Sequence, residues 1–158
     1  MSPVLVGRWK RQRTLQLPTG ESFTPRPAPH FLARFRCAQH VLGGEIDFLM
    51  DTGADITTIM PDDRDAICIP GRAMVDGCPS AMRGIGGAVP LRYVQGVTLQ
   101  FLGADGHALE PIALDRIGVL CVPLEIRPSY KGVPSLLGRD FLERGKLSLS
   151  ASGVTIEC

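Results

Sequence analysis

The sequence has 158 residues, of which 44% are hydrophobic, and a formal net charge of +1. These values exclude a chain that is disordered overall and fit one globular domain with a real core. No stretch approaches the roughly 20 apolar residues of a membrane span, and the first residues lack the order of a signal peptide, so we expect a cytoplasmic protein without membrane contact.

The first 29 residues are predicted to form a basic arm and linker. Their only acid is Glu21, and their bases are Arg8, Lys10, Arg11, Arg13 and Arg26. The segment ends in TPRPAP, whose prolines favour an extended linker. The arm could add strands to an interface, cover a cleft until it is cleaved, or bind an acidic partner. Basic runs are more often solvated faces than nucleic-acid sites, so we do not expect nucleic-acid binding.

Residues 30–158 are predicted to form an all-β domain. Short segments of alternating hydrophobicity are separated by Gly, Pro and Asp clusters: HFLARFRCAQ, EIDFLMD, LRYVQGVTLQFLG, IGVLCVPLEI, KLSLS and VTIEC. One short helix is predicted over residues 139–144, where Phe141 and Leu142 share a side and Gly145 can end the helix.

The cysteines give no sign of a disulfide framework or a zinc site. There are five, an odd number, and none forms a CxxC pair: Cys37, Cys68, Cys78, Cys121 and Cys158. We expect reduced thiols, and we expect neither a metal nor another cofactor.

The stretch FLMDTGADITTIMP places Asp51 directly after an apolar strand. A buried carboxylate without a partner is costly, so Asp51 either caps a turn or serves chemistry. Two carboxylates held close together share one proton, so one can act as a base on water while the other acts as an acid. Because the triplet Asp-Thr-Gly occurs once, the second carboxylate would have to come from a two-fold related chain.

Three motifs follow one another along the chain: DTGAD at 51–55, MRGIGGAV at 82–89 and SLLGRDFL at 135–142. With these motifs in this order, residues 30–158 resemble the retropepsin-like aspartic proteases. The resemblance implies a closed β-barrel of the acid-protease fold with one short C-terminal helix. It also implies an active site at a two-fold dimer interface, covered by a glycine-rich flap.

The resemblance assigns roles to the residues of the first motif. Asp51 would be the catalytic carboxylate, and Thr52 would hydrogen-bond across the dimer axis. Gly53 would let the backbone approach both the carboxylate and the substrate. Ala54 stands where serine is common in the family, so its side chain offers no hydroxyl to the carboxylate.

Arg139 would hold Asp55 with its planar fork and orient it towards the substrate backbone. The alternative for Arg139 is a surface pair with Asp140 or Glu143. In this family the chain ends interleave between subunits, an expectation that the additional N-terminal arm puts in question.

The resemblance gives seven residues a role in substrate binding: Leu49, Asp55, Gly84, Ile85, Gly86, Pro134 and Leu136. Gly84, Ile85 and Gly86 would belong to the flap tip, which opens to admit a peptide and closes to exclude water. The alternative is an ordinary surface loop, just as Leu49, Pro134 and Leu136 could be plain core. Arg83 places a cation beside the flap and would favour acidic outer substrate positions.

Taken together, the motifs predict an aspartic endopeptidase that acts as a homodimer on peptides or proteins bound in an extended conformation. The alternative is a dimeric peptide-binding or assembly module that has the protease fold but does not cleave. The intact Asp-Thr-Gly favours the enzyme, because a module without catalysis has no need of that carboxylate.

Overall fold

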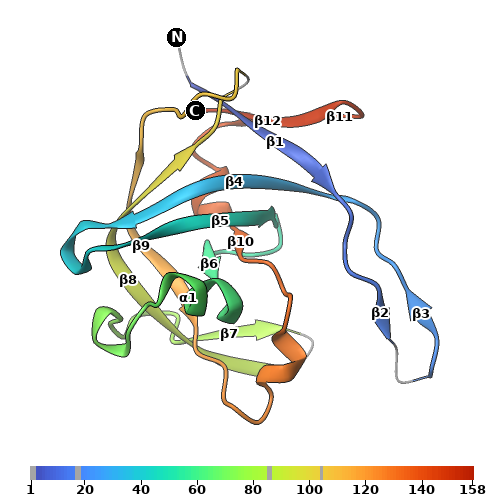
Figure 1. Cartoon of the computed structure of the whole chain (residues 1–158), viewed down its shortest axis with the longest axis vertical. Helices are drawn as coiled ribbons and strands as arrows, with labels where there is room; N and C mark the ends of the chain where they lie inside the picture. Colours follow the sequence, from blue (N-terminus) through green and yellow to red (C-terminus); the bar gives the residue numbers. More distant parts are fainter. Residues whose placement is uncertain (1–2, 17–18, 85–86, 104) are drawn as a thin grey trace.

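The computed structural model describes residues 3–16, 19–84, 87–103 and 105–158, and the described chain is mainly β with short helices (Figure 1). The strands are β1 (Val4–Lys10), β2 (Leu15–Gln16), β3 (Ser22–Phe23), β4 (Ala28–Cys37), β5 (Leu42–Met50), β6 (Thr58–Ile59), β7 (Ala81–Gly84), β8 (Gly87–Phe101), β9 (Ile112–Leu120), β10 (Leu136–Leu137), β11 (Lys146–Ser150) and β12 (Gly153–Glu157). The helices are α1 (Pro61–Ile67), α2 (Arg139–Leu142) and the 3-10 turns η1 (Ala38–His40), η2 (Gly71–Ala73) and η3 (Arg127–Tyr130).

Six strands close on themselves to form a barrel. The order β4-β5-β10-β6-β9-β8 runs through the main sheet, and β8 pairs back onto β4. Closure leaves these strands without free edges along the paired stretches. The closed barrel predicted from the sequence is therefore present in the strand pairing.

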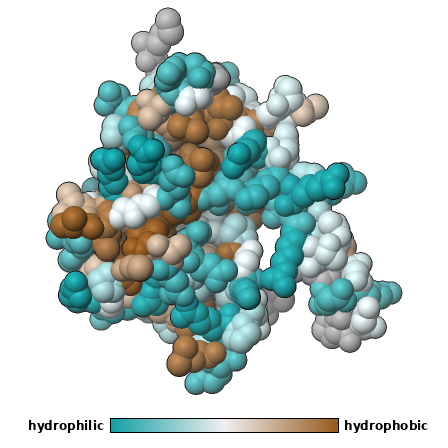
Figure 2. Space-filling model, viewed as in Figure 1, coloured by the Kyte–Doolittle hydropathy of each residue, from teal (hydrophilic) through white to brown (hydrophobic). Residues whose placement is uncertain are grey.

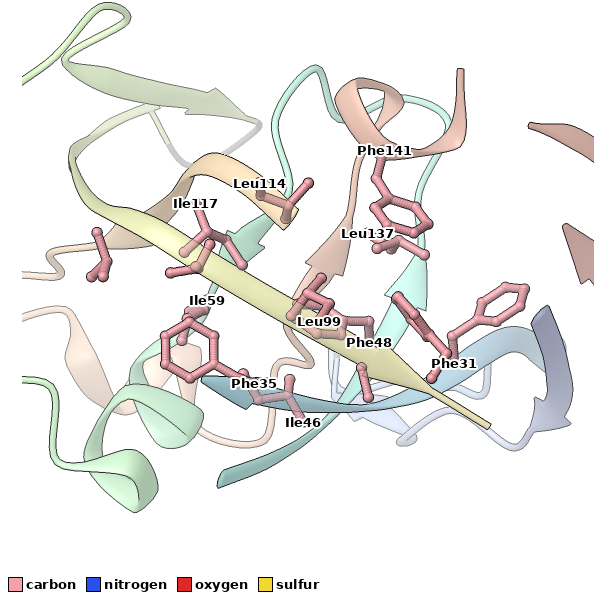
Figure 3. Packing of buried hydrophobic residues seen from close by; sticks show 14 of the residues in the cluster. Phe31, Phe35, Ile46, Phe48, Ile59, Leu99, Leu114, Ile117, Leu137 and Phe141 are labelled. Carbon is pink, nitrogen blue, oxygen red and sulfur yellow. The ribbon is translucent and has the colours of Figure 1, made fainter. Parts of the chain in front are cut away.

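The barrel interior is filled by side chains that alternate inward along each strand. In β4, Phe31 and Phe35 are buried while Arg34 points to solvent, which is the period-2 pattern of a half-buried strand. Figure 3 shows Phe31, Phe48 and Leu99 packing from neighbouring strands. Phe141 of α2 reaches the same core, so this short helix is fixed against the barrel.

A ribbon of β11, β12 and β1 lies across one end of the barrel (Figure 1). β1 comes from the segment predicted as an arm, and it pairs first with β12 and then with β4. The pairing places β12 between two strands of its own chain, whereas the family resemblance implied interleaved chain ends. Val4 and Val6 remain exposed on the ribbon, and Figure 2 shows hydrophobic surface at this end of the molecule. The domain boundary at residue 29 stays a prediction.

The predicted C-terminal helix is confirmed as α2, with Phe141 and Leu142 buried. The expectation of a single helix is wrong, because α1 also forms. Its first residue is Pro61, whose fixed φ suits that position, and Asp62 and Asp63 in the first turn complement the helix dipole. These features were visible in the sequence and identify the helix start.

All five cysteines lie in the described chain, and none of them forms a disulfide. Among the described residues, no helix is long and apolar enough to cross a membrane. The same residues contain no cluster of three or more His, Cys, Asp or Glu side chains arranged to hold a metal ion.

Candidate active site

Asp51 lies in the turn that follows β5, at the point where the parallel pair β5 and β10 ends. Its N–H donates to the carbonyl of Leu137 at 3.1 Å, which anchors the turn to β10. The half-buried carboxylate accepts a hydrogen bond at Oδ1 from the N–H of Gly53 at 2.8 Å. The turn thus fixes the orientation of its own carboxylate.

Gly53 and Thr52 form the exposed tip of this turn. A Cβ added to Gly53 would lie 3.1 Å from Oδ1 of Asp51, so a side chain here would crowd the carboxylate. Thr52 is exposed in the single chain, and its hydrogen bond across a dimer axis stays a prediction.

Helix α2 holds the turn from behind through the backbone. The N–H of Arg139 donates to the carbonyl of Ala54 at 2.8 Å, and the N–H of Asp140 donates to the carbonyl of Asp55 at 3.2 Å. Since Phe141 anchors α2 in the core, the position of the turn is tied to the barrel.

Thr57 links the same two segments through its buried side chain. Its hydroxyl donates to Oδ1 of Asp140 at 2.7 Å and accepts from the N–H of Gly138 at 3.0 Å. A Cβ on Gly138 would lie 2.6 Å from the carbonyl carbon of Ile56, so glycine is required for this close approach. Sequence reasoning missed the roles of Thr57 and Asp140. The available signal was Gly138 in the third motif, which indicated a close approach of two backbone segments.

The predicted pair between Arg139 and Asp55 is present as an ion pair, in preference to a pair with Asp140 or Glu143. The side chains are 52% and 73% exposed, respectively. An exposed pair contributes little to stability, and the role of Arg139 in orienting Asp55 towards a substrate stays a prediction.

A cleft of about 490 Å³ opens between this turn and β7. It is lined by Asp51, Gly53, Ala54, Asp55, Ile56, Pro79, Ala81, Met82, Arg83, Leu91 and Leu136. The apolar members Ile56, Met82 and Leu136 pack on a second hydrophobic cluster beneath the cleft. One face of the cleft is therefore apolar, and acidic side chains stand at its edge.

The opposite wall of the cleft is β7. It pairs with β8 in antiparallel register, and the last pair before the turn is Gly84 with Gly87. The predicted flap-tip residues Ile85 and Gly86 lie outside the described residues.

At the root of this hairpin, the Tyr93 hydroxyl donates to the carbonyl of Pro79 at 2.6 Å. Burial raises the pKa of Tyr93 above its usual value.

Arg116 also contacts the root of the β7–β8 hairpin, through Tyr93 and Cys78. Its guanidinium lies 4.1 Å from the centre of the Tyr93 ring and donates to the carbonyl of Cys78 at 2.8 Å. A cation over an aromatic face is attractive, so the two side chains support each other.

The predicted substrate-binding residues fall into different places. Asp55 and Leu136 line the cleft. Leu49 is half-buried in β5 opposite Leu136, and Pro134 lines a separate hollow beside Arg13. Sequence reasoning missed the cleft residues Ile56, Pro79, Ala81, Met82 and Leu91. Met82 stood inside the flap motif, which was the available signal.

No protein-family model matches the sequence, and no curated protein matches it. The structure is similar to the EIAV protease in complex with the inhibitor HBY-793, at 22% identity and a TM-score of 0.46, covering 77% of this chain and 93% of that chain. It is also similar to a retropepsin-like aspartic protease from Rickettsia conorii, at 17% identity and a TM-score of 0.46, covering 94% of this chain and 99% of that chain.

Proposed function

We propose that this chain is an aspartic endopeptidase that hydrolyses peptide bonds as a homodimer. The observation that carries the proposal is the carboxylate of Asp51, held by the Gly53 N–H in a turn that opens into the cleft. A turn aspartate with a purely structural role can also accept from the N–H two residues on, so the cleft in front of Asp51 is what favours chemistry.

The mechanism requires a second carboxylate, and the Asp51 of a two-fold related chain supplies it. The two carboxylates share one proton. The ionised one takes a proton from water as the water attacks the peptide carbonyl, and the protonated one donates to that carbonyl oxygen. The fixed turn keeps the carboxylate in place without reorganisation during the reaction.

The substrate would bind as an extended strand between the turn and β7. Backbone groups of residues 53–55 lie on one side of the cleft and β7 lies on the other, which suits strand addition. Met82 and Leu136 provide apolar contacts, and the exposed Arg83 favours acidic groups at outer positions.

The direct test is cleavage of a diverse peptide library by the wild-type chain and by Asp51→Asn. We expect cleavage to disappear in the variant, because an amide keeps the shape of the carboxylate but acts as neither base nor acid. The melting temperature should stay close to wild type, which serves as the control for folding. Unchanged cleavage by Asp51→Asn would refute the mechanism.

The same variant tests the two-chain site. Excess Asp51→Asn chains should suppress wild-type activity by forming mixed dimers with one carboxylate. Additive activities would show that each chain works alone. Peptide binding without cleavage by both proteins would instead support the non-catalytic module.

A further inference from the structure

Leu136 lines the cleft as the first residue of β10, and the residue before it, Ser135, is fully buried. The Ser135 carbonyl accepts a hydrogen bond from the N–H of Leu49 in β5 at 2.8 Å. The backbone of Ser135 therefore ties the start of this cleft wall to β5.

The side chain of Ser135 connects the same point to helix α1. Its hydroxyl accepts from the N–H of Met60, the residue before α1, at 2.9 Å and donates to Oδ2 of Asp63 at 2.5 Å. A serine hydroxyl has a single proton, so donation to Asp63 fixes the rotation that turns the oxygen lone pairs towards Met60. Hydrogen bonds in such a chain polarise one another, and a bond to a carboxylate is of the stronger kind. The half-buried Asp63 thus holds Ser135 in one geometry.

The neighbouring acid Asp62 makes a bond of a similar kind at a different place. Its Oδ2 accepts from the N–H of Gly132 at 2.8 Å, three residues before Ser135. Asp62 and Asp63 both lie in the first turn of α1, where acids complement the helix dipole. The two positions therefore share their helix and their charge, but it is Asp63 that contacts the residue next to Leu136.

We propose that Asp63 is a positioning residue for the candidate cleft, and that it acts through the Ser135 hydroxyl to fix the apolar wall at Leu136. The inference deepens the proposed function and rests on it, because that function makes the cleft a binding site for peptides. A wall fixed in place discriminates between apolar side chains by size, since a small one leaves contacts unmade and a large one has no room. The substrate class is therefore a peptide with an apolar side chain of defined size facing Leu136.

Hydrogen exchange tests the positioning without any need for cleavage. In Asp63→Ala, the N–H groups of Leu49 and Met60 should exchange about two- to tenfold faster than in wild type, which is the change that one weakened hydrogen bond gives. Asp63→Asn keeps an acceptor oxygen and should restore most of the protection. The matched control is Asp62→Ala, which loses an acid of the same turn and should leave both rates close to wild type.

The distribution of the change separates positioning from a general loss of stability. A variant that only destabilised the fold would speed exchange throughout the barrel, including the N–H groups of β4, by the same factor. Positioning confines the change to the residues bonded to Ser135. Equal acceleration at β4 and at Leu49 would overturn the proposal.

Cleavage kinetics test the size preference. A peptide that wild type cleaves is varied between valine and phenylalanine at the position where its size preference is strongest, and kcat and KM are measured for both. In Asp63→Ala the ratio of the two kcat/KM values should fall about two- to tenfold through KM. The kcat should be retained, because backbone bonds from α2 still hold the turn of Asp51. Asp62→Ala should keep the wild-type ratio.

A double variant tests the route through the hydroxyl. Ser135→Ala should lower the same ratio, and adding Asp63→Ala to it should change nothing further. Additive effects would overturn the route. If Ser135→Ala does not fold, the comparison of Asp63→Ala with Asp63→Asn decides, because the amide can still accept from the hydroxyl. Equal ratios in these two variants would overturn the route as well.

The outcomes separate this inference from the proposed function. If wild type binds peptides but does not cleave them, the enzyme is refuted, and the size preference is measured in the same variants as a ratio of Kd values. Cleavage by wild type with an unchanged ratio in Asp63→Ala leaves the enzyme standing and overturns the positioning. A wild type that neither binds nor cleaves peptides overturns both.

Discussion

The two walls of the candidate cleft are held in different ways. The turn of Asp51 is fastened from behind by backbone bonds from Arg139 and Asp140 and by the buried side chain of Thr57. The wall formed by β7 lies at the end of the sheet order. It is held at its root by hydrogen bonds from Tyr93 and Arg116 to backbone carbonyls of the exposed residues Pro79 and Cys78.

The difference separates a fixed wall from one that is free to adjust. A buried hydrogen-bond network restricts the turn, and such networks hold reactive groups in one geometry. A strand at the end of the sheet order, paired in the described chain with β8, is expected to open at lower free-energy cost than the core. Substitutions on the two walls should therefore differ in their cost.

Gly138→Ala should give the largest effect. The added Cβ would lie 2.6 Å from the carbonyl carbon of Ile56 and 2.8 Å from the nitrogen of Thr57, and backbone atoms cannot rotate away as a side chain can. We expect a loss of about 2–4 kcal/mol in the free energy of unfolding, measured by urea denaturation.

Gly71→Ala is the matched control, since no atom lies within 4 Å of its added Cβ. It should change stability by no more than about 1 kcal/mol, in either direction. Equal effects of the two substitutions would show that the fixed wall does not depend on the close approach at Gly138.

Thr57→Val sharpens the comparison within the fixed wall. Valine keeps the shape but leaves the Gly138 N–H without its acceptor and removes one donor to Asp140. The expected cost is about 1–3 kcal/mol. Thr58→Val is the control, because within the described part of the chain this equally buried hydroxyl bonds only to the carbonyl of Ile56, so its loss should cost about 1 kcal/mol. A larger cost at Thr58 would contradict the network.

The sequence predicted the long strands of the barrel better than its short ones. Alternation located β4, β5 and β8, because each runs for at least nine residues with one face buried. It could not locate β10, a strand of two residues that forms because β5 and β6 lie on either side of it. β1 was hidden by its basic residues, which suggested a solvated arm.

In the candidate site, too, some features could be predicted from the sequence and others depend on contacts in the folded chain. The first motif located the turn of Asp51, and the family resemblance, not a local pattern, supplied the ion pair between Asp55 and Arg139 across 84 positions. The contact between Thr57 and Asp140 joins residues 83 positions apart, and no periodicity reports such a contact. The cleft residue Leu91 was missed for a similar reason, since only the folded barrel shows that it faces the turn.

Tyr93→Phe tests the adjustable wall and should have the smallest effect. It removes one hydrogen bond, to the backbone of the exposed residue Pro79, and keeps the ring on which the Arg116 guanidinium lies. We expect a loss of about 0.5–1 kcal/mol at neutral pH, measured by urea denaturation. A loss as large as that of Gly138→Ala would show that both walls are fixed alike.

The pH dependence of the same variant gives a second measurement. Burial raises the pKa of Tyr93 above its usual value of 10.0, so the folded chain keeps this proton at a pH where the unfolded chain releases it. The contribution of Tyr93 to stability is therefore complete below pH 10 and declines as the pH rises through 10 towards the folded pKa. Phenylalanine has no proton to lose, so the stability difference between wild type and Tyr93→Phe should shrink above pH 10. Since Cys158 and the other titrating groups are shared by both proteins, they cancel in this difference, and a gap that stays constant to pH 11 would contradict the buried environment of the Tyr93 hydroxyl at the root of β7.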